Sequence, residues 1–160
     1  MHSQMLIRKA QIKDVDGLKQ LFFDTINAIN SRDYNKEQVE VWSSTVNNIK
    51  SLIDRIHKQH FYVAYNENGS ITGFASIDDS GYLDLMFVHK DFQRMGVASI
   101  LFEKLKEIAR TLKLMEITTE ASITAKPFFE KKGFTVIRQQ EIFINTVGLT
   151  NYKMQLLLAN

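Results

Sequence analysis

A strand-like segment, a glycine turn and a long amphipathic helix follow one another in this chain and restrict its fold most strongly. Residues 82–89 read as a strand, and a loop leads from them to Gly96. The helix that begins at Val97 has apolar residues at helical spacing: Leu101, Leu105, Ile108 and Leu112. Residues 116–121 read as a strand again. Such a strand–helix–strand crossover requires two parallel neighbouring strands with the helix on one face of the sheet.

The N-terminal part of the chain predicts one strand followed by three helices. Residues 5–10 are strand-like, and apolar residues at three- and four-residue spacing predict a helix with Asp14 as its N-cap. Asn35 and Gln38 resemble the capping pair of a short helix that ends near Trp42. A third helix has the apolar residues Ile49, Leu52, Ile53 and Ile56. In the sequence, these three helices therefore lie between the first strand and the second.

The remaining segments complete a mixed α/β order. Four of them have strand patterns: 61–65, 71–77, 134–144 and 151–158. A short helix over residues 124–132 is expected to stop at Gly133. We expect the last two strands to form an antiparallel pair, whose edge offers a surface through which a homodimer could form. No linker or repeat divides the chain, so the sequence predicts a single domain over residues 1–160.

Composition and charge exclude several classes of function. The chain has no cysteine, which removes disulfides, thiolate catalysis and thiolate metal sites. Its net charge is only +2, and its Lys and Arg residues are dispersed, which disfavours a nucleic-acid-binding protein. No apolar run approaches the roughly 18 residues of a membrane span, and the first residues lack the pattern of a signal peptide. We therefore expect a cytoplasmic protein that binds neither nucleic acid nor membrane.

The start of the helix at Val97 is a candidate anion site. The first turn of a helix has backbone N–H groups without intrahelical partners, and the helix dipole adds positive charge there. The small residues Gly96, Ala98 and Ser99 would let a pyrophosphate approach this backbone closely. Alternatively, Gly96 only ends a turn and the small residues pack against the sheet. The spacing by itself leaves both interpretations open.

Two motifs resemble those of the GNAT (GCN5-related) acetyltransferases. Residues 93–98, QRMGVA, are similar to the Q/R-x-x-G-x-G/A motif of that family. Residues 125–134, AKPFFEKKGF, are similar to its A-x-x-F-Y-E-x-x-G-F segment. The resemblance implies an N-acetyltransferase that moves an acetyl group from acetyl-CoA to a primary amine in a ternary complex, without a metal. It also implies a mixed, mostly antiparallel α/β sheet, splayed between its fourth and fifth strands, with helices on both faces.

The resemblance further implies which residues bind the cofactor. The glycine loop would bind the pyrophosphate, and a bulge in the fourth strand would leave a backbone N–H to polarise the thioester carbonyl. Ser122 occupies the position of a family Asn that contacts the cofactor arm, although it could instead cap the helix near Thr124. The predicted cofactor residues are Met86, Phe87, Val88, Gln93, Arg94, Met95, Gly96, Val97, Ala98, Ser122, Phe128 and Phe129.

Two carboxylates are candidates for catalysis. Asp84 interrupts an apolar strand and is the first candidate for the general base that deprotonates the amine. In the alternative interpretation, Asp84 faces outward while Leu83, Leu85 and Phe87 face inward. Glu120, at the end of the next strand, could activate an amine through water, bind a cationic acceptor, or simply be solvated.

One position departs from the family pattern. Phe129 stands where the family usually has a Tyr that protonates the leaving thiolate, so the proton must come from water or another tyrosine, or the thiolate leaves without one. Loss of that Tyr is also the main support for an alternative function, a non-catalytic CoA-binding or interaction module. Phe128 and Phe129 would equally fit a plain helix core.

The acceptor is the least defined part of the prediction. Tyr34 and Trp42 lie in the helical segment that borders the acceptor pocket in this family, and both rings could hold a cationic or aromatic substrate. The partner is expected to be a small-molecule or peptide amine. The four His residues, at positions 2, 57, 60 and 89, lack metal-ligand spacing, so we interpret them as surface or structural residues and predict no metal.

Overall fold

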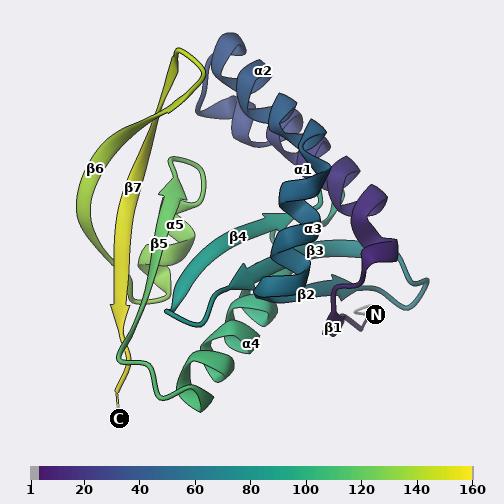
Figure 1. Cartoon of the computed structure of the whole chain (residues 1–160), viewed down its shortest axis with the longest axis vertical. Helices are drawn as coiled ribbons and strands as arrows, with labels where there is room; N and C mark the ends of the chain where they lie inside the picture. The colour runs from purple at the N-terminus through teal and green to yellow at the C-terminus, as the bar shows by residue number, and fades with distance from the viewer. Residues whose placement is uncertain (1–3, 160) are drawn as a thin grey trace.

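The computed structural model describes residues 4–159 and, over that range, forms one seven-stranded sheet covered by helices (Figure 1). The strands are β1 Leu6–Lys9, β2 His60–Tyr65, β3 Ile71–Ile77, β4 Tyr82–Val88, β5 Glu116–Ser122, β6 Thr135–Ile144 and β7 Val147–Leu157. The helices are α1 Val15–Ala28, α2 Lys36–Ser44, α3 Ile49–Lys58, α4 Val97–Thr111 and α5 Lys126–Lys131. Short 3₁₀ turns are η1 Ile12–Asp14, η2 Asn30–Arg32, η3 Thr45–Asn47 and η4 Lys90–Phe92.

The sheet is mixed, as predicted. Its strands follow the order β1-β2-β3-β4-β5-β7-β6, with β1 and β6 at the edges. Neighbouring strands are antiparallel except β4 and β5, which run parallel. Because α4 connects β4 to β5, the predicted crossover is confirmed. The predicted antiparallel pairing of the last two strands is confirmed as well.

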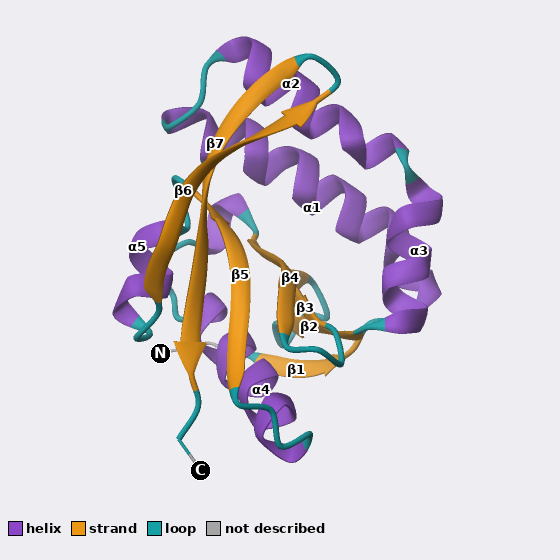
Figure 2. Cartoon of the chain, turned by 60° about the vertical axis from the view of Figure 1, so that its left-hand side comes forward, coloured by secondary structure: helices purple, strands orange, loops and turns teal. Residues whose placement is uncertain are grey.

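The two faces of the sheet pack against different helices. Below α4 and α5, the core contains Leu101, Phe102 and Phe129 together with alternate residues of β2 and β3. The opposite face packs Leu18 and Leu21 of α1 against the other residues of the same strands. This division follows from the alternation of side chains along a strand. Figure 2 shows the central strands between α4 on one side and the layer of α1 and α3 on the other.

The start of α4 is held close to β3 by a glycine. A Cβ at position 73 would lie 2.7 Å from Cγ1 of Val97 and 3.0 Å from the carbonyl oxygen of Phe87. Because such distances are too short for a real Cβ, only Gly73 permits this packing. Val97 is the first residue of α4, so this contact fixes the start of the helix against the sheet.

The predicted caps have different outcomes. Asn35 and Gln38 form a reciprocal capping box at the start of α2, with both hydrogen bonds at 2.8 Å, as predicted. Asp14 occupies the N-cap position of α1, as predicted, but its side chain makes no capping hydrogen bond. Its carboxylate instead accepts hydrogen bonds from Arg8 at 2.8 and 2.9 Å and from the backbone N–H of Gln11 at 2.7 Å. Asp14 therefore ties β1 to the segment that leads into α1.

Three local boundaries differ from the sequence prediction. The sequence predicted a connection over residues 145–150 between the last two strands. In the structure, β6 and β7 are longer, and the hairpin between them turns at residues 145–146. Asn145 takes the positive φ of 55° that this tight turn requires. The helix expected over residues 124–132 begins at Lys126, after a turn. Leu112, predicted in the buried stripe of α4, is 40% exposed because the helix ends one residue before it.

Candidate active site

β4 and β5 are paired over a short length and then separate (Figure 2). Their parallel ladder joins Tyr82 to Thr118 and Leu83 to Thr119. The Thr119 hydroxyl donates a 2.9 Å hydrogen bond to the Leu83 carbonyl at this last pair. Both strands continue beyond it, but no further residue of the described ladder joins them. The predicted splay between the fourth and fifth strands is therefore confirmed.

β4 has a bulge at Asp84. Ser76 of β3 pairs with Leu85 and Ile77 pairs with Leu83, so Asp84 has no partner across this ladder. An extra residue in one strand shifts the alternation of side chains. As a result, Leu83 belongs to the core under α4, whereas Leu85 belongs to the core under α1. The interpretation that placed these two leucines on one side of the strand was wrong.

Beyond the bulge, β4 directs backbone groups into the split. His89 donates its N–H to the Thr72 carbonyl of β3 at 2.8 Å. Because hydrogen bonding alternates along an antiparallel strand, the backbone groups of Met86 and Val88 point away from β3, toward the split. Two side chains donate to the Val88 carbonyl: Thr25 Oγ1 at 3.0 Å and Gln93 Nε2 at 2.8 Å. The N–H groups of Met86 and Val88 therefore face the opening between the strands.

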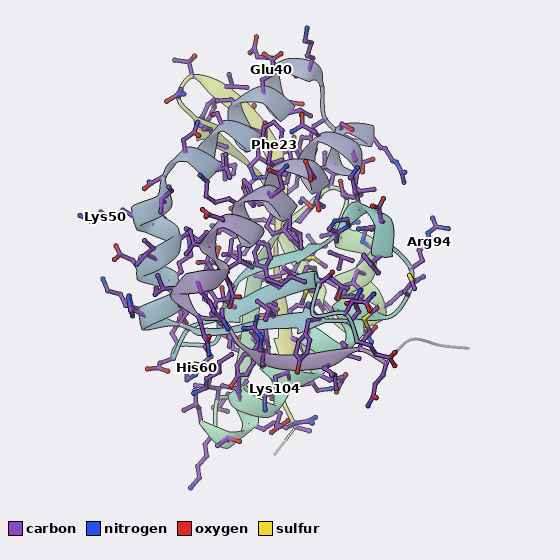
Figure 3. The ribbon with its side chains drawn as sticks, turned by 90° about the vertical axis from the view of Figure 1, so that its right-hand side faces the viewer. Phe23, Glu40, Lys50, His60, Arg94 and Lys104 are labelled. Carbon is purple, nitrogen blue, oxygen red and sulfur yellow. The ribbon has the colours of Figure 1, made fainter. Side chains whose placement is uncertain are left out.

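The N-terminus of α4 is open. Gly96 occupies the N-cap position with φ 83°, a left-handed conformation that favours glycine, and no side chain caps the first turn. A Cβ at Gly96 would meet no atom within 4 Å. In the preceding loop, Arg94 has φ 59° and projects outward from the molecule (Figure 3), and Met95 is 52% exposed. The first-turn N–H groups and the helix dipole are thus available to an anion.

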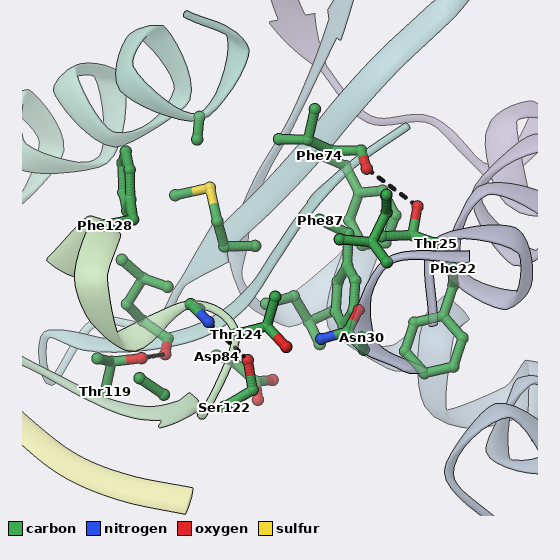
Figure 4. A pocket seen from close by; sticks show the side chains of 18 of the residues that line it. Phe22, Thr25, Asn30, Phe74, Asp84, Phe87, Thr119, Ser122, Thr124 and Phe128 are labelled. Atoms are coloured by element: carbon green, nitrogen blue, oxygen red, sulfur yellow. Dashed lines mark hydrogen bonds between the residues drawn. The ribbon is translucent and has the colours of Figure 1, made fainter. Parts of the chain in front are cut away.

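A single cavity of about 1060 Å³ joins these features. It extends from the open end of α4, past the exposed edge of β4, to the space enclosed by α1 and α3. Every predicted site residue lines it except Met95. Figure 4 shows side chains that reach the cavity from both sides of the split: Phe22 and Thr25 of α1 with Phe74 and Phe87 of the sheet on one side, and Thr119, Ser122, Thr124 and Phe128 from β5 to α5 on the other.

The segment after β5 uses its polar and aromatic residues for local packing. The Ser122 hydroxyl accepts a 3.0 Å hydrogen bond from the N–H of Ala125, so it stabilises the turn before α5. Phe129 is 2% exposed and packs against Phe128 and Phe134, with ring centroids 5.3 and 5.1 Å away. Phe129 is thus part of the core while its edge borders the cavity.

Asp84 is bound by one side chain of α3 and by one from the residue that follows this helix. Its Oδ2 accepts a 2.6 Å hydrogen bond from Nε of Arg55 and a 2.9 Å hydrogen bond from Nε2 of Gln59. Arg55 is also held by the Ser51 hydroxyl, 2.6 Å from its Nη1. The Asp84 side chain is only 14% exposed, so this ion pair is partly shielded from water. Asp84 therefore fastens α3 to β4 at the bulge.

Glu120 lies across the split from Asp84, on β5. Its Oε1 accepts a 3.2 Å hydrogen bond from the Tyr82 hydroxyl, and its Oε2 accepts a 2.6 Å hydrogen bond from the side chain of Gln140. Burial, together with the negative charges of Glu120 and Asp84, raises the pKa of Tyr82 well above its ordinary value. Tyr82 therefore stays protonated and remains a donor to Glu120. Glu120 itself is exposed to solvent.

Tyr34 and Trp42 form an aromatic wall of the cavity. Their ring centroids are 5.4 Å apart, and Trp42 also packs edge-on against Phe87 at 6.4 Å. The Tyr34 hydroxyl donates to the Thr150 carbonyl at 2.7 Å and accepts from the N–H of Ile123 at 2.9 Å. Burial raises the pKa of Tyr34 above its ordinary value. Its hydroxyl thus joins the end of β5 to β7.

Comparison with known proteins shows the family of this chain. A family model described as an acetyltransferase (GNAT) domain matches residues 30–156. The chain belongs to the GNAT acetyltransferase family. It is also 32% identical, over 149 residues and 93% of each chain, to the uncharacterized N-acetyltransferase YafP of Escherichia coli strain K12. The protein is therefore a GNAT N-acetyltransferase that uses acetyl-CoA.

Solved structures share the fold over almost the whole chain. A GCN5-related N-acetyltransferase from Rhodopseudomonas palustris is 26% identical, with a TM-score of 0.93 and coverage of 99% of this chain and 98% of that one. The PaiA N-acetyltransferase of Thermoplasma acidophilum, solved in complex with coenzyme A, has a TM-score of 0.79 at 16% identity, covering 97% of this chain and 99% of that one. At that identity the second likeness concerns the fold alone.

Several residues at the site were not among the sequence predictions. Arg55 and Gln59 bind Asp84 from a helix and the residue that follows it, and the sequence does not give the position of this helix. The Thr25 hydroxyl of α1 donates to the Val88 carbonyl, and the sequence likewise does not give the position of α1 relative to β4. Thr119 and Asn151, in contrast, are polar residues at buried strand positions. Departure from the apolar strand pattern is the signal that could have identified these two.

No metal or membrane feature is found in the part of the chain that the structure describes. No group of three or more His, Cys, Asp or Glu residues within residues 4–159 is arranged to hold a metal ion. Over the same range, none of the helices has the length and apolar character needed to cross a bilayer. His60 contacts Asp79 at 2.7 Å, and Nδ1 of His89 accepts the N–H of Asp91 at 3.0 Å, which are structural roles. His2 lies outside the described residues.

Proposed function

We propose that the enzyme acetylates a primary amine of a small molecule or peptide by direct attack on the thioester, with both substrates bound together. The observation that carries this proposal is the continuous cavity, which connects the open end of α4 with the carboxylates Asp84 and Glu120. Two substrates that enter from these two ends would meet at the split between β4 and β5. The chain has no cysteine that could take up the acetyl group as a thiolate.

The cofactor end of the cavity fits coenzyme A. The uncapped first turn of α4 at Gly96 would bind the pyrophosphate, and the β4 edge at Met86 and Val88 would hydrogen-bond the pantetheine arm. The thioester supplies an activated acetyl group. An N–H of Met86 or Val88, directed into the split, would stabilise the negative charge that develops on the carbonyl oxygen. One such donor is typically worth about 3 kcal/mol of barrier.

Glu120 is the better placed of the two carboxylates to remove a proton from the amine. Oδ2 of Asp84 already accepts hydrogen bonds from Arg55 and Gln59, and the Asp84 side chain is only 14% exposed. Within residues 4–159, the hydrogen-bond partners of the Glu120 carboxylate are the neutral donors Tyr82 and Gln140, and Glu120 is exposed to solvent. It would act on the amine directly or through a water molecule. Asp84 would position α3 along the acceptor end.

The proton for the departing thiolate would come from water. Phe129 has no hydroxyl, and the tyrosines that line the cavity already use theirs: Tyr34 for two backbone groups and Tyr82 for Glu120. The cavity is open along the exposed α4 loop, so water can enter it. No further side chain is needed for this step.

An acetyl-CoA release screen tests the proposal. Thiol release would be measured over a library of amines, amino acids, amino sugars and peptides, and the acetylated products identified by mass spectrometry. We expect at least one amine class to release thiol, with intersecting initial-rate lines as both substrates are varied. Parallel lines would indicate a covalent acetyl-enzyme and contradict direct attack. CoA binding without thiol release from any amine would contradict the proposed reaction itself.

A further inference from the structure

Asn151 of β7 is a buried polar residue whose side-chain oxygen has no partner. It is 7% exposed, and its Oδ1 makes no hydrogen bond within residues 4–159. Burying an amide without a hydrogen bond costs stability, so such groups are uncommon in folded proteins and call for an explanation. A ligand that binds the amide in the working enzyme is one such explanation.

The residues opposite Asn151 on the adjacent strands hydrogen-bond to other groups. Ser122 lies opposite on β5 and Gln140 lies opposite on β6. The Ser122 hydroxyl accepts the N–H of Ala125, and the Gln140 amide donates to Glu120 and accepts from Arg138. No hydrogen bond joins either side chain to Asn151 within residues 4–159. Asn151 lines the cavity, so a bound ligand is a candidate partner for its amide.

Asn151 lies on the same side of the sheet as the proposed base. Asn151 and Lys153 share one face of β7, and Lys153 lies opposite Glu120. The other face of β7 has Met154, which is buried in the core under α4 and α5. Asn151 is therefore on the same side of the sheet as Glu120, the proposed base. The open end of α4 lies on the opposite side.

We infer that Asn151 binds a hydrogen-bonding group of the acceptor, a hydroxyl or carbonyl near the amine that is acetylated. A carboxamide can offer its amino group or its oxygen by half a rotation, so it can serve either group. Asn30 is buried at the same cavity, and Figure 4 shows it together with Thr124 near the centre of the view. The acceptor is thus a polar amine and not an alkylamine. This inference rests on the proposed function.

Matched pairs of amines test the inference. 2-Aminoethanol would be compared with propylamine, and glycinamide with isobutylamine, since the members of each pair are similar in size and differ in hydrogen-bonding capacity. The polar members are also less basic, so kcat/KM is calculated for the unprotonated amine. We expect the wild-type enzyme to prefer the polar member in kcat/KM by about ten- to a hundredfold. In Asn151→Leu, which keeps a similar volume, that preference should fall to about twofold or less, with unchanged affinity for CoA. If that variant does not fold, Asn151→Ala provides the same readout.

A second buried group serves as a control. Ser76 is fully buried, and its Oγ also has no partner within residues 4–159, but it does not line the cavity. Ser76→Ala should leave the preference between the paired amines unchanged. A wild-type enzyme without preference, an Asn151→Leu enzyme that keeps it, or a variant that loses CoA affinity instead would each overturn the inference. The proposed function fails separately, when no amine of the whole library releases thiol.

Discussion

The hydroxyl of Thr119 lies 2.9 Å from the carbonyl oxygen of Leu83, at the last pair that joins β4 to β5. Thr119 is 3% exposed, so this hydrogen bond is shielded from water. It connects the two halves of the sheet immediately before they separate. The width of the split, and with it the place where the two substrates would meet, therefore depends on this contact between β4 and β5.

Thr119→Val should destabilise the protein and weaken CoA binding. Valine has nearly the same shape but cannot donate to Leu83, so the lost hydrogen bond should lower the free energy of unfolding by about 1 kcal/mol. Urea unfolding and titration calorimetry with CoA would measure the two effects. Thr118→Val is the control, because Thr118 pairs with Tyr82 through the backbone and its side chain is only partly buried. Equal behaviour of the two variants would contradict the role of this hydroxyl.

Gly96→Glu should abolish CoA binding and leave the fold intact. The added carboxylate would occupy the open end of α4 and repel the pyrophosphate. Gly96→Ala is the matched control: both variants have a Cβ at φ 83°, which costs about 1 kcal/mol, but alanine adds no charge. Titration calorimetry with CoA should therefore detect binding to Gly96→Ala and none to Gly96→Glu. Similar affinities in the two variants would refute the placement of the pyrophosphate.

Glu120→Gln and Asp84→Asn should have different consequences. Loss of a general base lowers kcat by about 10²- to 10⁴-fold, so Glu120→Gln should do so without a change in thermal stability. Asp84→Asn should mainly release α3, lower the melting temperature and raise KM for the amine, because Arg55 loses its charged partner. Initial-rate kinetics of both variants give kcat and KM, and thermal unfolding gives their melting temperatures. A loss of kcat confined to Asp84→Asn would assign the base to Asp84 instead.

Tyr34→Phe should lower stability through two buried backbone groups. The Thr150 carbonyl and the Ile123 N–H would both lose their hydrogen bond to the hydroxyl. A cost of about 1–3 kcal/mol in the free energy of unfolding is expected, since groups that lose their partner in the interior stay unsatisfied. Tyr152→Phe is the comparison, because Tyr152 is only partly buried. Urea unfolding should show a larger loss of unfolding free energy for Tyr34→Phe than for Tyr152→Phe, and equal losses would contradict this role of the Tyr34 hydroxyl.

Acid should weaken the connection between β1 and α1. The hydrogen bond from Arg8 lowers the pKa of Asp14 below its ordinary value of 3.8, despite burial. A carboxylate whose pKa is lower in the folded state stabilises fully above its ordinary pKa, and the contribution is lost as the pH falls through the lowered value. Wild-type protein should thus exceed Asp14→Asn in unfolding free energy by a constant amount above about pH 5, and by less toward pH 2. A difference that does not vary with pH would contradict this assignment.

The sequence predicted the fold well because its strongest signals are local. Periodicity located the strands and helices within a few residues, and Asn35 and Gln38 fixed the start of α2. The crossover followed from one helix between two strand patterns. The hairpin at Asn145 was placed less well, because Asn145 and Gly148 are both turn-forming residue types, and the sequence does not show which of them ends the strand.

The contacts at the candidate site were harder to predict, because they join segments far apart in the chain. Arg55 and Asp84 are separated by 29 residues, and Tyr34 and Thr150 by 116. Neither pair has a local sequence pattern. The resemblance implied a bulge in β4 but not its position at Asp84, which depends on the register between β3 and β4. A resemblance to a family indicates where a site lies, but only the packed structure shows which polar side chains already have partners.

The two-residue ladder between β4 and β5 has a consequence for the cell. Few backbone hydrogen bonds join the two halves of the sheet, so a ligand bound between them would add contacts that hold the halves together. Because a ligand that binds only the native state stabilises it by mass action, resistance to proteolysis should rise with the concentration of free coenzyme A. The lifetime of this enzyme would then follow the metabolic supply of its own co-substrate.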